Sequence, residues 1–79
     1  MEQTIIDFIT EDIHGGDPAL GLRPEDDLLN GGILGSMDMM RVVEFLERTY
    51  GFRVPPQDMA IENFVTVSAM AGYVSRVTA

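Results

Sequence analysis

The stretch from Gly31 to Glu47 reads GGILGSMDMMRVVEFLE, and the rest of the chain is organised around it. Its glycines lead into Ser36, and from there apolar residues recur with the spacing of an amphipathic helix of about four turns. Serine is favoured at helix starts, because its hydroxyl can accept a hydrogen bond from a free backbone N–H. The stretch therefore predicts a single hydroxyl at the beginning of a helix.

The predicted helix spans residues 36–50 and has one apolar face. The residues of that face, which we expect to contact the core, are Met39, Val42, Val43, Leu46 and Tyr50. Met37 and Met40 fall on or beside the opposite side, so the pattern leaves two methionines in water. Gly51 should end the helix, since glycine readily adopts the left-handed conformation, and Pro55-Pro56 prevents its continuation.

Two further helices are predicted, one on each side of this stretch. The first runs from about Thr4 to His14 before Gly15-Gly16, and its apolar half is Ile5, Ile6, Phe8, Ile9 and Ile13. Thr66 is a typical N-cap for a last helix to about Val77, whose apolar side is Val67, Met70, Ala71, Tyr73, Val74 and Val77. A short turn around residues 57–62 should lie between the last two helices.

Residues 15–35 form a long connection between the first two helices, with six glycines, two prolines and little periodicity. Such a length in a small domain predicts a loop with packed anchors, namely Leu20, Leu22, Leu28, Leu29, Ile33 and Leu34. No strand pattern or internal repeat is evident. We therefore expect a single all-α domain over residues 1–79, a small bundle of three main helices plus one short helix, with a long loop between helices one and two.

The composition narrows the class of partner. Thirteen acidic residues face five arginines and no lysine, which gives a formal net charge of −8. Such a surface repels the phosphates of nucleic acids and anionic lipids, and attracts proteins with basic patches. The sequence shows neither a basic, apolar leader nor a run long enough to cross a bilayer. We expect a cytoplasmic monomer with no nucleic-acid or membrane partner.

Neither hydrolysis nor metal chemistry fits the pattern. Ser36 lacks the Gly-x-Ser-x-Gly elbow of many hydrolases, and the only histidine, His14, is better explained as a complement to the negative end of the first helix. The chain has no cysteine, and Glu25-Asp26-Asp27 lacks the ligand spacing of a calcium loop. We expect no catalytic residue and no metal site.

Two interpretations of Ser36 remain open from the residues alone. It can be a structural helix cap, which is the common role of a serine at this position. It can also be a modification site, because the glycines before it allow close approach and a phosphate ester would lie at the positive end of the helix. Met37 and Met40 beside it are either isolated exposed side chains or an adaptable docking face.

The segment from Leu28 to Leu34, followed by Gly35-Ser36-Met37, resembles the attachment segment of the acyl carrier and peptidyl carrier proteins, also called thiolation domains. That family has Asp-Ser-Leu or Asp-Ser-Met where this chain has residues 35–37. The resemblance is most specific from Asp27 to Tyr73, and its later landmarks are Glu44-Phe45-Leu46-Glu47, Phe52-Arg53-Val54-Pro55 and Thr66-Val67 through Tyr73-Val74.

The resemblance implies that a phosphopantetheinyl transferase, using coenzyme A and magnesium, converts Ser36 to a phosphopantetheine ester. The terminal thiol would carry an acyl or aminoacyl thioester between a loading ligase and downstream synthases or transferases. The arm supplies the sulfur that the polypeptide lacks, so the carrier needs no catalytic activity of its own. Candidates for a cleft that shelters the cargo, with core packing as the alternative, are Val43, Leu46, Val54, Met59 and Phe64.

Two departures from the family pattern affect partner recognition. Gly35 replaces the usual acid before the serine, so recognition by the transferase should rely on Met37 and Asp38 instead. Arg41 and Arg48 interrupt the acidic face that fatty-acid carriers present on this helix, although the spacing also allows Asp38 to pair with Arg41. The predicted docking residues are Met37, Asp38, Met40 and Arg41.

These features favour a stand-alone carrier in nonribosomal peptide, polyketide or aminoacyl-transfer biosynthesis, with a fatty-acid synthesis carrier as the alternative within the family. The alternative from another class is an unmodified helical protein–protein interaction module. In that case Met37 and Met40 would form the docking face, and Ser36 would only cap the helix.

Overall fold

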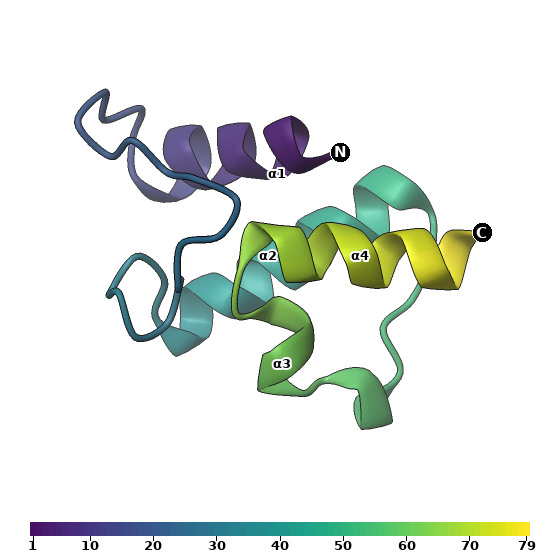
Figure 1. Cartoon of the computed structure of the whole chain (residues 1–79). Coiled ribbons are helices and arrows are strands. Elements are labelled where there is room, and N and C mark those ends of the chain that lie inside the picture. The colour runs from purple at the N-terminus through teal and green to yellow at the C-terminus, as the bar shows by residue number, and fades with distance from the viewer.

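The computed structural model describes all residues from Met1 to Ala79, and its regular structure is entirely helical (Figure 1). The elements are α1 (Glu2–Phe8), a π-helical turn η1 (Ile9–Ile13), α2 (Ser36–Tyr50), a 3₁₀ turn η2 (Pro56–Asp58), α3 (Ile61–Phe64) and α4 (Val67–Thr78). The predicted all-α class, with three main helices, a short one and a long first loop, is confirmed. No helix is long and apolar enough to cross a membrane.

The first helix begins earlier than predicted and ends in a wider turn. The His14 N–H donates to the Ile9 carbonyl at 3.1 Å, which is the five-residue spacing of a π-helix. Over one turn, the apolar spacings of α- and π-helices hardly differ, so the apolar pattern does not predict this change. Gly15 and Gly16, with φ of 64° and 78°, then end the helix as predicted.

The second helix has the bounds that the sequence predicts, and its C-terminal stop is also confirmed. Gly51 adopts the left-handed conformation with φ 69°, and its N–H donates to the Glu47 carbonyl at 3.0 Å. The Glu47 carboxylate then accepts the Val54 N–H at 2.8 Å. These two bonds to Glu47 hold the segment after α2 against the last turn of that helix.

The core is formed by α1, α2 and α4, which pack against one another, together with side chains from the long loop. Between α1 and α2, the rings of Phe8 and Phe45 stack with centroids 4.2 Å apart. All of the buried residues are hydrophobic, and they are Ile5, Ile9, Leu22, Leu28, Leu34, Val42, Val43, Leu46, Phe64, Val67, Met70, Tyr73 and Val74. Burial of each large side chain contributes about 1.5–3 kcal/mol before entropy is counted.

The long loop is well packed and runs along the side of the molecule away from both termini (Figure 1). Its backbone is joined to the α3–α4 junction at two points. The Leu28 N–H donates to the Val65 carbonyl at 2.8 Å, and the Ser68 N–H donates to the Pro24 carbonyl at 2.9 Å. The predicted anchors are all buried or half-buried, namely Leu20, Leu22, Leu28, Leu29, Ile33 and Leu34.

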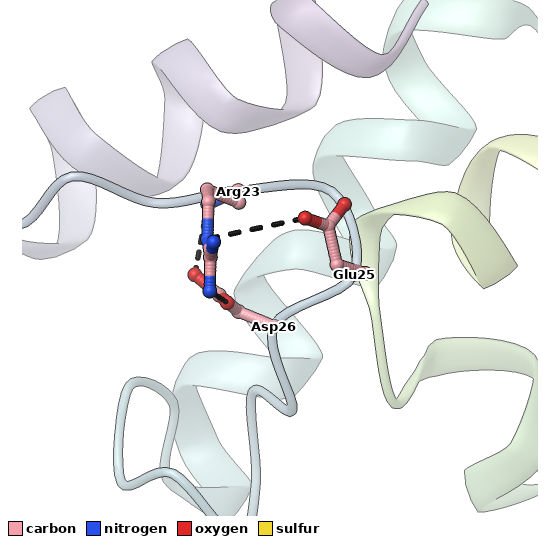
Figure 2. Close-up of polar contacts among 3 residues, drawn as sticks. All are labelled: Arg23, Glu25 and Asp26. Carbon is pink, nitrogen blue, oxygen red and sulfur yellow. Dashed lines mark hydrogen bonds and ion pairs between the residues drawn. The ribbon is translucent and has the colours of Figure 1, made fainter.

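The acidic run in this loop is partly balanced by one arginine (Figure 2). The Arg23 guanidinium lies 3.9 Å from the Glu25 carboxylate and 3.5 Å from that of Asp26. The Arg23 and Glu25 side chains are exposed, so these contacts contribute little to stability. No group of three His, Asp or Glu side chains in the molecule lies close enough together to hold a metal ion.

The last helix starts at the predicted cap. The Thr66 hydroxyl accepts the Ala69 N–H at 2.9 Å, which satisfies one donor of the first turn. The apolar face of α4 is buried as far as Val74. Val77, which the pattern assigns to that face, is 43% exposed, because the last turn of the helix extends past the core.

Candidate functional site

Ser36 is the first residue of α2, and its side chain is exposed. The N-cap is Gly35, whose backbone is extended, and the Asp38 carboxylate accepts the Gly35 N–H at 3.0 Å. The interpretation of Ser36 as the helix cap is therefore wrong. The side chain that bonds to the N-cap backbone is that of Asp38, in the first turn. The exposed Ser36 is left free for another role.

The start of α2 is suited to a phosphate group. The first backbone N–H of the helix that finds a backbone acceptor is that of Met39, which donates to the Gly35 carbonyl at 3.0 Å. The N–H groups of Ser36, Met37 and Asp38 precede it and are left at the positive end of the helix. A phosphate ester on the serine oxygen would place its charge beside these donors, so the residues present fit phosphopantetheine.

A tight turn precedes this helix. The Asp27 carboxylate accepts both the backbone N–H and the side-chain N–H of Asn30, each at 2.9 Å. These bonds, the backbone one foremost, lower the pKa of Asp27 below 3.8. A Cβ on Gly31 would lie 2.4 Å from the Asp27 carbonyl oxygen, so only glycine fits there. The glycine-rich approach to Ser36 therefore contains an ordered turn at this point.

The residues between this turn and Ser36 are also held in place. The Leu28 carbonyl accepts the N–H groups of Ile33 and Leu34, at 3.0 and 2.9 Å. The Ile33 carbonyl in turn lies 2.6 Å from Nε2 of His14, at the end of η1. The sequence predicts a role for His14 only at the end of its own helix, because no local pattern signals a bond across 19 residues.

The four predicted docking residues lie on the first two turns of α2. Met37 is 83% exposed and Met40 is 51% exposed, so both methionines project from the core as predicted. The predicted pairing of Asp38 with Arg41 does not form. Asp38 is half-buried against Gly35, and the Arg41 guanidinium reaches across to the Asp12 carbonyl at 3.3 Å.

A small apolar pocket opens beside the start of α2. Its volume is about 90 Å³, and it is lined by Leu29, Met39, Met59, Ala60, Ile61 and Phe64. Met59 and Phe64 were cleft candidates, whereas the candidates Val43 and Leu46 lie in the buried core and Val54 packs against it. Met39, one turn after Ser36, was assigned to the core from its position on the helix stripe. Met39 also packs against the core, and its position at the N-terminal end of that stripe was the available signal.

Comparisons with known proteins agree with this geometry. The family model described as phosphopantetheine attachment site matches residues 15–74. A solved chain from a structure titled "Crystal structure of FAD-dependent dehydrogenase" superposes with a TM-score of 0.77 and 27% sequence identity, over 89% of this chain and 97% of that chain. No curated protein sequence matches the chain significantly. The chain belongs to the phosphopantetheine attachment site family, whose domain carries that group covalently.

Proposed function

We propose that Ser36 carries the phosphopantetheine and that its thiol holds acyl or aminoacyl intermediates for partner enzymes. The observation that supports this most directly is the exposed serine at the first residue of α2, within the matched residues. When bound, the group supplies a thiol on a long arm. The polypeptide presents the serine, while Asp38 closes the helix start without using the serine hydroxyl.

The polypeptide itself has no catalytic role in this proposal. A nucleophilic serine needs a base within hydrogen-bond distance. The only histidine is His14, and its Nε2 contacts the Ile33 carbonyl at 2.6 Å. This arrangement supports a carrier on which partner enzymes act, as distinct from a hydrolase.

The primary test is intact mass after incubation with coenzyme A, magnesium and a broad-specificity phosphopantetheinyl transferase. We expect the wild-type chain to gain one phosphopantetheine and Ser36→Ala to gain none. Ser68→Ala, at another exposed serine near the start of a helix, is the matched control and should be modified like the wild type. No gain with an active transferase, or an equal gain in Ser36→Ala, would favour the unmodified interaction module.

A second test concerns the docking face, which comprises Met37, Asp38, Met40 and Arg41. Met37→Ala and Arg41→Glu should lower turnover by the loading enzyme several-fold with no loss of helix content, because both residues are exposed on the first two turns of α2. Arg53→Glu reverses an exposed charge beyond the end of α2 and serves as the control. Unchanged loading kinetics in both docking variants would place the contact surface elsewhere.

The pathway proposal rests on charge and on the solved neighbour. Arg41 and Arg48 are both exposed on α2, and they repel a basic partner that expects an acidic helix, which disfavours fatty-acid synthesis. We place the carrier in nonribosomal peptide, polyketide or aminoacyl-transfer biosynthesis. The small apolar pocket, which Met39 of the first turn of α2 helps to line, is the proposed shelter for the cargo, with Met59 and Phe64 in its wall.

The solved neighbour also suggests one partner class. The matched chain is about as short as this one, since the alignment covers 89% of this chain and 97% of that chain. Such a length is below that of most domains, so we infer that the matched chain is a small companion of the dehydrogenase. A flavin-dependent dehydrogenase is therefore the first partner to test. An acyl or aminoacyl thioester on this carrier should lose two hydrogens as the flavin is reduced, and a cargo of unchanged mass would exclude this partner.

A further inference from the structure

His14 makes a long-range contact next to the proposed modification site. Its ring is half-buried at the end of η1, and Nε2 lies 2.6 Å from the Ile33 carbonyl oxygen. Since a carbonyl only accepts, the ring nitrogen is the donor. This contact joins the end of the first helix to the segment three residues before Ser36.

The π-helical turn holds the imidazole in position from its own side. The His14 N–H donates to the Ile9 carbonyl at 3.1 Å, and the Gly16 N–H donates to the Thr10 carbonyl at 2.7 Å. The backbone on both sides of the histidine is thus hydrogen-bonded. The π-helical turn also has a contact with α2, because the Arg41 guanidinium donates to the Asp12 carbonyl.

On the loop side, the histidine adds one hydrogen bond to those of the segment before the serine. The N–H groups of Ile33 and Leu34 both donate to the Leu28 carbonyl. The Ile33 carbonyl accepts the hydrogen bond from Nε2 of His14. Leu34 is buried, and the Gly35 N–H is bound by Asp38. Each residue from Ile33 to Gly35 therefore has a bonded or buried group, and Ser36 follows directly.

We propose that His14 is a positioning residue for modification of Ser36, which rests on the proposed function. Its bond to Ile33 holds the approach segment in the shape that the transferase binds. An enzyme that binds an already ordered loop loses less conformational entropy on association. His14 therefore strengthens binding of the carrier by the transferase, and this contribution is measured by the KM of the transferase for the carrier.

The test compares His14→Leu with His14→Gln. Leucine keeps much of the side-chain volume without a donor, whereas glutamine keeps an N–H donor at similar reach. We expect His14→Leu to lower kcat/KM of phosphopantetheine transfer roughly two- to tenfold, mainly through KM, which is the ratio expected for loss of one hydrogen bond. His14→Gln should restore most of it. Amide NMR signals of residues 33–36 should shift in the leucine variant while helix content stays constant.

Arg23→Ala is the control in the same loop. Its side chain is exposed and forms ion pairs with Glu25 and Asp26 (Figure 2), so the transfer rate should not change. Wild-type kinetics in His14→Leu would overturn the positioning role while Ser36 stays modified. An equal loss in both His14 variants, in step with lost helix content, would also overturn it. A wild-type chain that an active transferase does not modify would overturn the proposed function as well.

Discussion

Leu46 shows how a single side chain contributes to the fold. It is 0% exposed in the centre of α2, within the cluster shared by the three main helices. Leu46→Ala removes buried methyl groups and leaves a cavity, so we expect the free energy of unfolding to fall by about 2–5 kcal/mol. Urea denaturation followed by circular dichroism measures this. Ile61→Ala, at a side chain that is 68% exposed, should shift the midpoint little, and a similarly small shift for Leu46→Ala would contradict its core position.

Tyr73 gives the fold a dependence on high pH. Burial of the ring, followed by the hydrogen bond that its hydroxyl donates to the Asp58 carboxylate at 2.8 Å, raises the pKa of Tyr73 from 10.0 to about 12. Because the folded state favours the neutral phenol, this stabilisation is complete below pH 10 and is lost between pH 10 and 12. Unfolding free energies across that range should decline more in the wild type than in Tyr73→Phe. Parallel curves would show that Tyr73 titrates normally.

Local residue rules predicted some positions and missed others. The helix stop at Gly51 was predicted because it depends only on the left-handed backbone conformation of one residue. The cap at Thr66 was predicted because it depends only on one side-chain acceptor. The helix-cap interpretation of Ser36 was wrong, because glycine and serine are both accepted as N-caps and Gly35 takes that position. The choice depends on the reach of Asp38 to the Gly35 N–H, which is a property of the folded turn.

At the scale of elements, the start of α4 depends on one cap. Thr66→Ala leaves the Ala69 N–H without its side-chain acceptor, so we expect a loss of about 0.5–2 kcal/mol in the free energy of unfolding. Thermal and urea denaturation measure it. Thr66→Ser keeps the hydroxyl and should retain most of the stability. If alanine and serine behaved alike, the hydroxyl would not be the stabilising group.

Helices whose bounds depend on their own residues were predicted better than features that depend on contacts between distant segments. The bounds of α2 follow from its apolar stripe and its glycine stop. The π-helical turn and the apolar pocket do not follow from local pattern. The pocket in particular brings Leu29 and Met39 to Ile61, which comes from a short helix much later in the chain. Such a site exists only after the elements have packed.

At the scale of the whole molecule, charge should govern encounters with partners. The net charge of −8 attracts basic enzymes over distances that salt shortens, from about 10 Å at 0.1 M to about 3 Å at 1 M. We expect kcat/KM of phosphopantetheine transfer to fall as ionic strength rises, while turnover at saturating carrier changes little. Initial rates of phosphopantetheine transfer, measured over a series of carrier and salt concentrations, give both kcat/KM and kcat. A kcat/KM that does not depend on salt would rule out electrostatic steering.

The class of fold and the family follow from the order of features along the chain, from helix periods through Ser36 to the Thr66 cap. The contact of His14 with Ile33 does not follow, because it depends on where a non-local loop lies against η1. The sequence thus predicted which residue stands at the proposed site. It did not predict which distant residues support it.

The two backbone bonds between the long loop and the α3–α4 junction have a consequence for synthesis. The Leu28 N–H and the Pro24 carbonyl find their backbone partners only beyond α2, at the Val65 carbonyl and the Ser68 N–H. A nascent polypeptide that has emerged from the ribosome only as far as α2 therefore lacks two of the backbone partners that hold the long loop before Ser36. We therefore expect the transferase to modify the chain efficiently only after α3 and the start of α4 have been synthesised.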